Sequence, residues 1–167
     1  MPKVVTLPSN TVEAYPLIGI YRGDNSYLPH YNQSTTQTIL PGEPVVKAFG
    51  TENRVMISSR SIAPLEVGNV HANWVAEFPC ILSATVKEGD AIYWDTDAVD
   101  ADHPVGAAVL LGDLIDGFLL GYASYVEVPG QKPTISAGKV VCGTTASAHI
   151  RVVYKDEDTV YGDNGSV

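Results

Sequence analysis

The stretch Lys87-Glu88-Gly89-Asp90-Ala91-Ile92-Tyr93-Trp94-Asp95 determines the fold class of this 167-residue chain. Gly89-Asp90 suits a turn that needs a positive φ, because glycine has no Cβ to clash in that region. In the strand that follows, alternation of side chains places Ile92 and Trp94 on the same face. Asp95 can end this strand, since its carboxylate can accept a hydrogen bond from the backbone just beyond it. The stretch therefore predicts a tight turn followed by a β-strand.

The composition and the other apolar segments extend this prediction to the rest of the chain. Valine occurs 21 times, and the 15 glycines and 11 prolines favour short strands joined by tight turns over long helices. Short strands at close spacing predict a mainly β fold, with a small β-barrel or β-sandwich as its body. One helix is expected, at residues 107–116. Strands are expected at residues 43–49, 54–58, 70–78, 81–86, 91–94, 118–128, 140–142 and 148–154.

The chain is expected to have three parts. Residues 1–38 are predicted to form an extended N-terminal arm, residues 39–154 the β-barrel body, and residues 155–167 an acidic C-terminal tail. No apolar periodicity in the arm lasts long enough for a helix or a sheet face. Tyrosine offers a large contact area at low entropic cost and a hydroxyl group that seeks a partner. We therefore predict a docking arm, with simple disorder as the alternative; its four candidate partner-binding residues are Tyr15, Tyr21, Tyr27 and Tyr31.

The charge balance excludes several classes of partner. The chain carries 10 basic and 19 acidic residues, a net charge of −9, which argues against binding to nucleic acid or to an anionic membrane surface. The most apolar stretch, residues 104–126, contains Asp113 and Asp116 near its middle, so no membrane span is expected. Charged residues make up only 17% of the chain, against roughly 25% in ordinary soluble domains. A surface so poor in charge suggests that another molecule covers part of it.

Standard catalytic signatures do not occur in the sequence. It contains no glycine-rich nucleotide loop, no paired-histidine zinc motif and no nucleophile elbow. Cys80 and Cys142 are too far apart for a zinc pair and are expected to be buried, inert thiols. The four histidines are scattered singly. We therefore expect a protein that is not an enzyme and has no cofactor and no small-molecule substrate.

One acidic run is the strongest candidate for chemistry. Hard cations bind several carboxylate oxygens from one loop, so a calcium site or a metal-assisted hydrolase can be considered. The spacing is not that of the helix–loop–helix calcium loop, and the favoured interpretation is an acidic surface turn between two strands. The run comprises Asp95, Asp97, Asp100 and Asp102, followed by His103.

The body resembles the capsid decoration (cement) proteins of tailed bacteriophages. Residues 87–95 carry most of this likeness, because the family shows a similar block of Gly-Asp, an aliphatic residue, Tyr, Trp and Asp. The resemblance covers roughly residues 39–154. The chain departs from the family in its long arm and in two stretches that look like insertions, residues 104–115 and 129–138. Supporting segments follow in the same order at residues 41–46, 74–79, 119–123 and 148–154.

This resemblance implies a structural role. Members of the family bind the outside of an icosahedral head, often as trimers at local threefold positions, and clamp neighbouring major capsid subunits. The implied partners are the major capsid protein and further copies of the chain in a homotrimer. The implied location is the outer capsid surface of the virion, after synthesis in the host cytoplasm. The alternative is a carbohydrate-binding or host-attachment module of the virion, for which Trp74 and Trp94 are candidate exposed aromatic residues.

Overall fold

The computed structural model describes residues 20–23, 27–58, 60–72, 74–125 and 129–154, with side chains from residue 28 onward. The described residues are mainly β, with a curled half-barrel sheet and further sheets, and they contain no α-helix. This confirms the mainly β fold class. No helix in these ranges is long and apolar enough to cross a membrane. The chain divides into two compact units, Met1–Trp74 and Val75–Val167.

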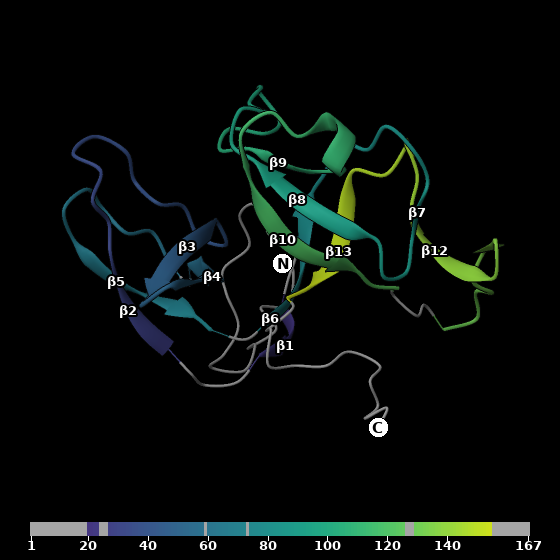
Figure 1. Cartoon of the computed structure of the whole chain (residues 1–167), viewed down its shortest axis with the longest axis horizontal. Helices are drawn as coiled ribbons and strands as arrows, with labels where there is room; N and C mark the ends of the chain where they lie inside the picture. Colours follow the sequence, from purple (N-terminus) through teal and green to yellow (C-terminus); the bar gives the residue numbers. More distant parts are fainter. Residues whose placement is uncertain (1–19, 24–26, 59, 73, 126–128, 155–167) are drawn as a thin grey trace, which may run out of the picture. The chain divides into compact units, whose positions relative to one another are not determined.

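The first unit contains a four-stranded antiparallel sheet in the order β2-β5-β4-β3 (Figure 1). Strands β3 and β4 form a hairpin whose turn uses Gly50 at φ 61, a value that glycine adopts without steric cost. The core of this unit is Met56, Ile62 and Val70, packed against partly buried apolar neighbours. The strands of the unit are β1 (Ile20–Gly23), β2 (Tyr27–Tyr31), β3 (Pro44–Phe49), β4 (Glu52–Ser58) and β5 (Val67–His71).

The second unit contains a larger sheet, in which five antiparallel strands follow the order β6-β13-β10-β8-β9 (Figure 1). A three-stranded sheet, β11-β12-β7, accompanies it. The strands of the larger sheet are β6 (Trp74–Pro79), β8 (Ala91–Asp95), β9 (Ala107–Val109), β10 (Gly117–Ala123) and β13 (His149–Val153). The smaller sheet has β7 (Val86–Lys87), β11 (Ile135–Ser136) and β12 (Lys139–Gly143), and one 3₁₀ turn, η1, covers Leu111–Asp113.

Aromatic packing forms the core of the second unit. Ile92 and Trp94 are both buried on one face of β8, as the alternation of that strand predicts. The rings of Phe78 and Trp94 meet edge to face with centroids 5.8 Å apart, an arrangement that aromatic quadrupoles favour. Trp94 is only 1% exposed and Trp74 only 3% exposed. Neither tryptophan is therefore exposed, so these two residues give the host-attachment alternative no support.

Several predicted elements are wrong in extent or type. The helix expected at 107–116 is instead strand β9 followed by the short turn η1. Ala107–Val109 pairs with β8 and is fully buried, and Gly112 in η1 has low helix propensity. The strand expected at 81–86 is reduced to β7, the one expected at 70–78 is divided into β5 and β6, and the one expected at 118–128 ends at Ala123. Strand β11 was not expected at all.

The end of the predicted arm belongs to a sheet. Residues 27–31, placed in the arm by the sequence, form β2 and pair with β5. Pro29 hides this strand from sequence reasoning, yet it is tolerated because β2 lies at the edge of the four-stranded sheet. The division between the two compact units falls after Trp74. Residues 1–19 of the arm and the whole predicted tail, 155–167, lie outside the described residues.

Candidate functional site

Asp95, the first residue of the acidic run, is an internal anchor. Its side chain is 1% exposed at the end of β8. The carboxylate accepts hydrogen bonds from the backbone N–H groups of Asp97 at 2.9 Å, Ile115 at 3.0 Å and Asp116 at 3.3 Å. Burial raises the pKa of Asp95, but these N–H donors outweigh burial and hold the pKa below its usual value. Asp95 therefore joins the turn after β8 to the segment before β10.

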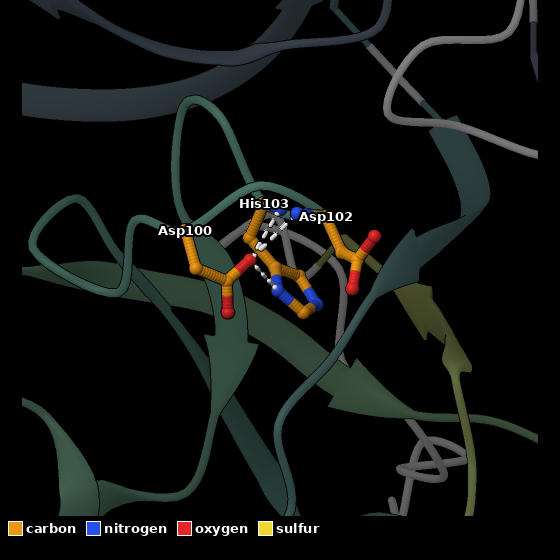
Figure 2. Close-up of polar contacts among 3 residues, drawn as sticks. All are labelled: Asp100, Asp102 and His103. Carbon is orange, nitrogen blue, oxygen red and sulfur yellow. Dashed lines mark hydrogen bonds and ion pairs between the residues drawn. The ribbon is translucent and has the colours of Figure 1, made fainter.

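Asp100 performs a similar task within its own turn (Figure 2). One oxygen of its carboxylate accepts the backbone N–H groups of Asp102 and His103, both at 2.8 Å. The same oxygen lies 2.8 Å from Nδ1 of His103. The hydrogen bond from the His103 side chain, together with the backbone donors, lowers the pKa of Asp100. Figure 2 shows the Asp102 carboxylate on the far side of the imidazole, directed away from Asp100.

The acidic run is thus an arrangement of turns. Two of its carboxylates are occupied by backbone N–H groups, and the remaining carboxylates, of Asp97 and Asp102, are exposed. Among the described residues, no group of three or more His, Cys, Asp and Glu side chains is arranged to hold a metal ion. Asp97, Asp100 and Asp102 lie in an exposed turn, whereas Asp95 is buried and not part of an acidic surface.

Only one of the four candidate tyrosines has a described side chain. Tyr15 lies outside the described residues, and the structure gives only the backbone of Tyr21 in β1 and of Tyr27 in β2. Tyr31 ends β2 and is 47% exposed. Its Cα partner on β5 is Val67, which is 65% exposed. Partners in an antiparallel pair share a face, so these two apolar side chains lie next to each other in contact with solvent.

A buried asparagine organises the backbone beside this pair. Nδ2 of Asn32 donates to the carbonyl oxygens of Ile62 at 2.9 Å and Gln37 at 2.8 Å, and Oδ1 accepts the N–H of Ser34 at 3.1 Å. The backbone N–H of Leu65 donates to the Asn32 carbonyl oxygen at 2.9 Å. Asn32 thereby connects the polar stretch after β2 to the turn before β5.

Leu65, whose backbone N–H bonds to the residue after Tyr31, is a third exposed apolar residue in this region. It is 53% exposed and has φ 61, a conformation that is uncommon for a bulky residue. Such conformations persist only where the surrounding structure enforces them, and they occur often at functional sites. We call these three exposed residues, Tyr31, Leu65 and Val67, the Tyr31 patch.

The second unit displays a comparable apolar segment. In residues 111–116, here called the Ile115 loop, Leu111 is 65% exposed and Ile115 is 76% exposed. The sequence prediction missed this loop because it assigned the segment to a helix. The signal that was available is Gly112 followed by Asp113, a pair typical of a turn.

Side chains from outside the Ile115 loop hold it in place. Oγ of Ser83 donates to the Asp113 carboxylate, and Oγ1 of Thr96 donates to the Asp116 carbonyl oxygen at 2.9 Å. With the Asp95 bonds to Ile115 and Asp116, the loop is fixed at several points. In each unit, therefore, a buried polar side chain fixes the backbone beside exposed apolar side chains: Asn32 in the first unit and Asp95 in the second.

Comparison with known proteins adds no assignment, since no family model, no curated protein and no solved structure matches the chain.

Proposed function

We propose that this chain is a structural virion protein that binds the outside of an icosahedral phage head. It acts as a homotrimer at local threefold positions, stabilises contacts between major capsid subunits and is made in the host cytoplasm. The observation that carries this proposal is the Tyr31 patch, an exposed apolar surface on fixed backbone. Aromatic and other apolar residues are typical contact residues of protein interfaces. Because the backbone of the Tyr31 patch is already ordered, it loses little conformational entropy when it docks.

The resemblance of residues 87–95 to phage decoration proteins supports the same proposal. In the structure this block is a tight turn between β7 and β8. Gly89 has φ 87, and the Asp90 carboxylate accepts the backbone N–H of Lys87 at 2.9 Å. The strand that follows carries Ile92 and Trp94 into the core. These are the structural duties that the residue types of the block predict.

The stabilising effect on a shell follows from linkage. A protein that binds the assembled shell, and not the free subunits, shifts the equilibrium towards the shell by mass action. When three copies are joined, the second and third contacts become intramolecular, so modest contacts combine into strong binding. A small apolar patch in each copy is sufficient under this arrangement.

The test is binding of the full-length chain to empty expanded heads made of the major capsid protein encoded in the same genome. We expect co-sedimentation at hundreds of copies per head, a trimer in analytical ultracentrifugation and heads that resist higher temperature. The double variant Tyr31→Ser/Val67→Ser should bind about tenfold more weakly, since two exposed anchors are lost. The matched control is Val46→Ser, an exposed valine on β3 at the opposite edge of the same sheet.

A wild-type chain that remains monomeric and does not sediment with the heads contradicts the proposed function. If the double variant and the control bind equally well, the chain still binds heads, but the Tyr31 patch is not the surface that contacts them. We do not propose the host-attachment alternative, because both tryptophans on which it depended are buried.

A further inference from the structure

We propose that the Ile115 loop is a separate docking element, and that it inserts into an apolar pocket rimmed by lysine and arginine side chains on a protein surface. This inference rests on the proposed function, because it identifies the pocket as part of the outer head surface. Three observations carry it: the exposure of two apolar side chains, the fixation of the loop and the sign of the charge around it.

Two large apolar side chains of the loop are exposed to solvent, where such side chains are not usually found. Ile115, at 76%, is the most exposed large apolar side chain among the described residues, and Leu111 is 65% exposed. No residue of η1 is buried, so Leu111 adds nothing to the core of its own unit. Exposed apolar side chains surrounded by polar ones are typical of protein–protein contact sites.

Fixation of the loop favours docking over mere tolerance of exposed residues. The backbone of Ile115 is fixed by a hydrogen bond to the buried Asp95 carboxylate. The side chains of Ser83 and Thr96 donate hydrogen bonds to Asp113 and Asp116. A loop that is already ordered loses little conformational entropy when it binds, so more of the contact energy appears as affinity. Exposed anchors of this kind act as binding hot spots when a partner pocket removes them from water.

The charge around the loop defines the chemistry of the partner. Residues 86–116 contain one lysine and eight acidic residues. Asp113 and Asp116 lie within the loop, and Asp97 lies in the turn that Asp95 connects to it. All three side chains are exposed. Complementary potentials accelerate encounter and fix the docked orientation, so the pocket that receives Leu111 and Ile115 carries basic residues at its rim.

A second copy of the chain does not fit this description. In a twofold contact each loop would meet the same loop of its partner, and their aspartates would repel one another. A heterologous contact with another part of the chain would need clustered basic residues, and the whole chain has only 10 lysine and arginine residues in 167. The loop therefore points to a different protein.

The experiment measures binding of full-length variants to the same expanded heads at several salt concentrations. Leu111→Ser/Ile115→Ser should weaken binding about tenfold or more, because two apolar anchors are lost. The matched control is Ile135→Ser on β11, another exposed isoleucine of the second unit. Unchanged circular dichroism and melting of both variants show that folding is intact.

A second pair of variants tests the rim. Asp97→Asn/Asp116→Asn removes two negative charges. The hydrogen bonds of these residues described above are made by their backbone N–H and C=O groups and not by their carboxylates, so the bonds remain. We expect this variant to bind more weakly than the wild type at low salt. Its affinity should fall less than that of the wild type as the salt concentration increases, because fewer charge contacts are left for salt to screen. Glu52→Gln on β4, outside the second unit, is the matched control and should bind like the wild type.

The possible outcomes separate the two proposals. If wild-type chain does not bind heads, the proposed function fails and the loop inference fails with it. If wild-type chain binds and Leu111→Ser/Ile115→Ser binds equally well, only the loop inference is overturned. It is also overturned if this variant changes the oligomeric state of the free chain, since the loop would then contact a second copy.

Discussion

The backbone N–H of Ile115 donates a hydrogen bond to the Asp95 carboxylate at 3.0 Å, which connects a buried acid to a highly exposed apolar residue. The two residues are 20 positions apart, and the contact joins the end of β8 to the segment before β10. The stability of the second unit and the presentation of its apolar loop therefore depend on the same carboxylate.

Asp95→Ala should lower the free energy of unfolding by about 3 kcal/mol, because several backbone N–H groups lose a charged acceptor in a buried site. The measurement is urea denaturation at pH 7 followed by tryptophan fluorescence. Asp102→Ala is the matched control: its carboxylate is exposed, and only its backbone N–H bonds to Asp100. Equal stability of the two variants would show that Asp95 is not an anchor.

The same carboxylate predicts a dependence of stability on pH. The pKa of Asp95 is lower in the folded chain than in the unfolded chain. Its stabilising contribution is therefore present above the unfolded pKa of about 4 and is lost as the pH falls through the folded pKa. The free energy of unfolding of the wild type should decrease between about pH 4 and pH 2, and that of Asp95→Asn should decrease less steeply. Parallel curves would contradict the assignment. Burial raises the pKa of Glu43, so this residue contributes to the pH dependence with the opposite sign. Its contribution is the same in the wild type and in Asp95→Asn, and it cancels when the two curves are compared.

Gly117→Ala should destabilise the second unit by about 1–3 kcal/mol, the usual effect of overpacking. A Cβ at this position would overlap the carbonyl oxygen of Trp94, and that backbone cannot move without disturbing β8. Gly112→Ala is the matched control, because a Cβ there meets nothing within 4 Å. Thermal melting of the two variants provides the measurement, and similar melting temperatures would contradict the close approach.

Both cysteine thiols should react slowly in the folded chain. Burial raises the pKa of Cys80 to about 12, and burial with nearby Glu88 and Asp90 raises the pKa of Cys142 to about 11. The thiolate is the reactive form, so alkylation by iodoacetamide at pH 8 should be about a hundredfold slower than in urea. Mass spectrometry of modified peptides distinguishes the two sites. Rapid native labelling of Cys142 alone would indicate that β12 opens locally.

Asn32→Ala should destabilise the first unit by about 1–3 kcal/mol, since the buried Asn32 side chain loses its hydrogen bonds to the carbonyl oxygens of Ile62 and Gln37. The neighbouring variant Gln33→Ala removes an exposed side chain and should change the stability by less than about 0.5 kcal/mol. Urea denaturation measures both. If the two variants are equally stable, Asn32 does not hold the backbone beside the Tyr31 patch.

Local chemistry was sufficient to predict part of the structure. Gly89-Asp90 predicts its turn because only the local backbone conformation is involved, and the alternation after it correctly places Ile92 and Trp94 on one face of the strand. The β-rich composition likewise predicts the fold class. The burial expected for the two cysteines is confirmed for Cys80, while Cys142 is only partly buried.

The errors have a shared physical origin, since each depends on which distant segment a strand meets. Residues 107–109 are apolar enough for a helix, and their pairing with β8 decides that they form a strand. Residues 27–31 contain a proline that argues against a strand, and their pairing with β5 overrides it. Trp74 and Trp94 could have been exposed or buried, and packing within the folded chain settled this question.

By itself, then, the sequence determined the β-rich class, the tight turn at residue 89, the shared face of Ile92 and Trp94 and the acidic character of residues 86–116, because these follow from residue type and nearest neighbours. Only the tertiary structure decided that Asp95 and Asn32 are buried anchors and that Ile115 and Tyr31 are displayed beside them. The reason is physical: a carboxylate or an amide becomes an anchor only when the fold brings it to the N–H and C=O groups of a remote segment.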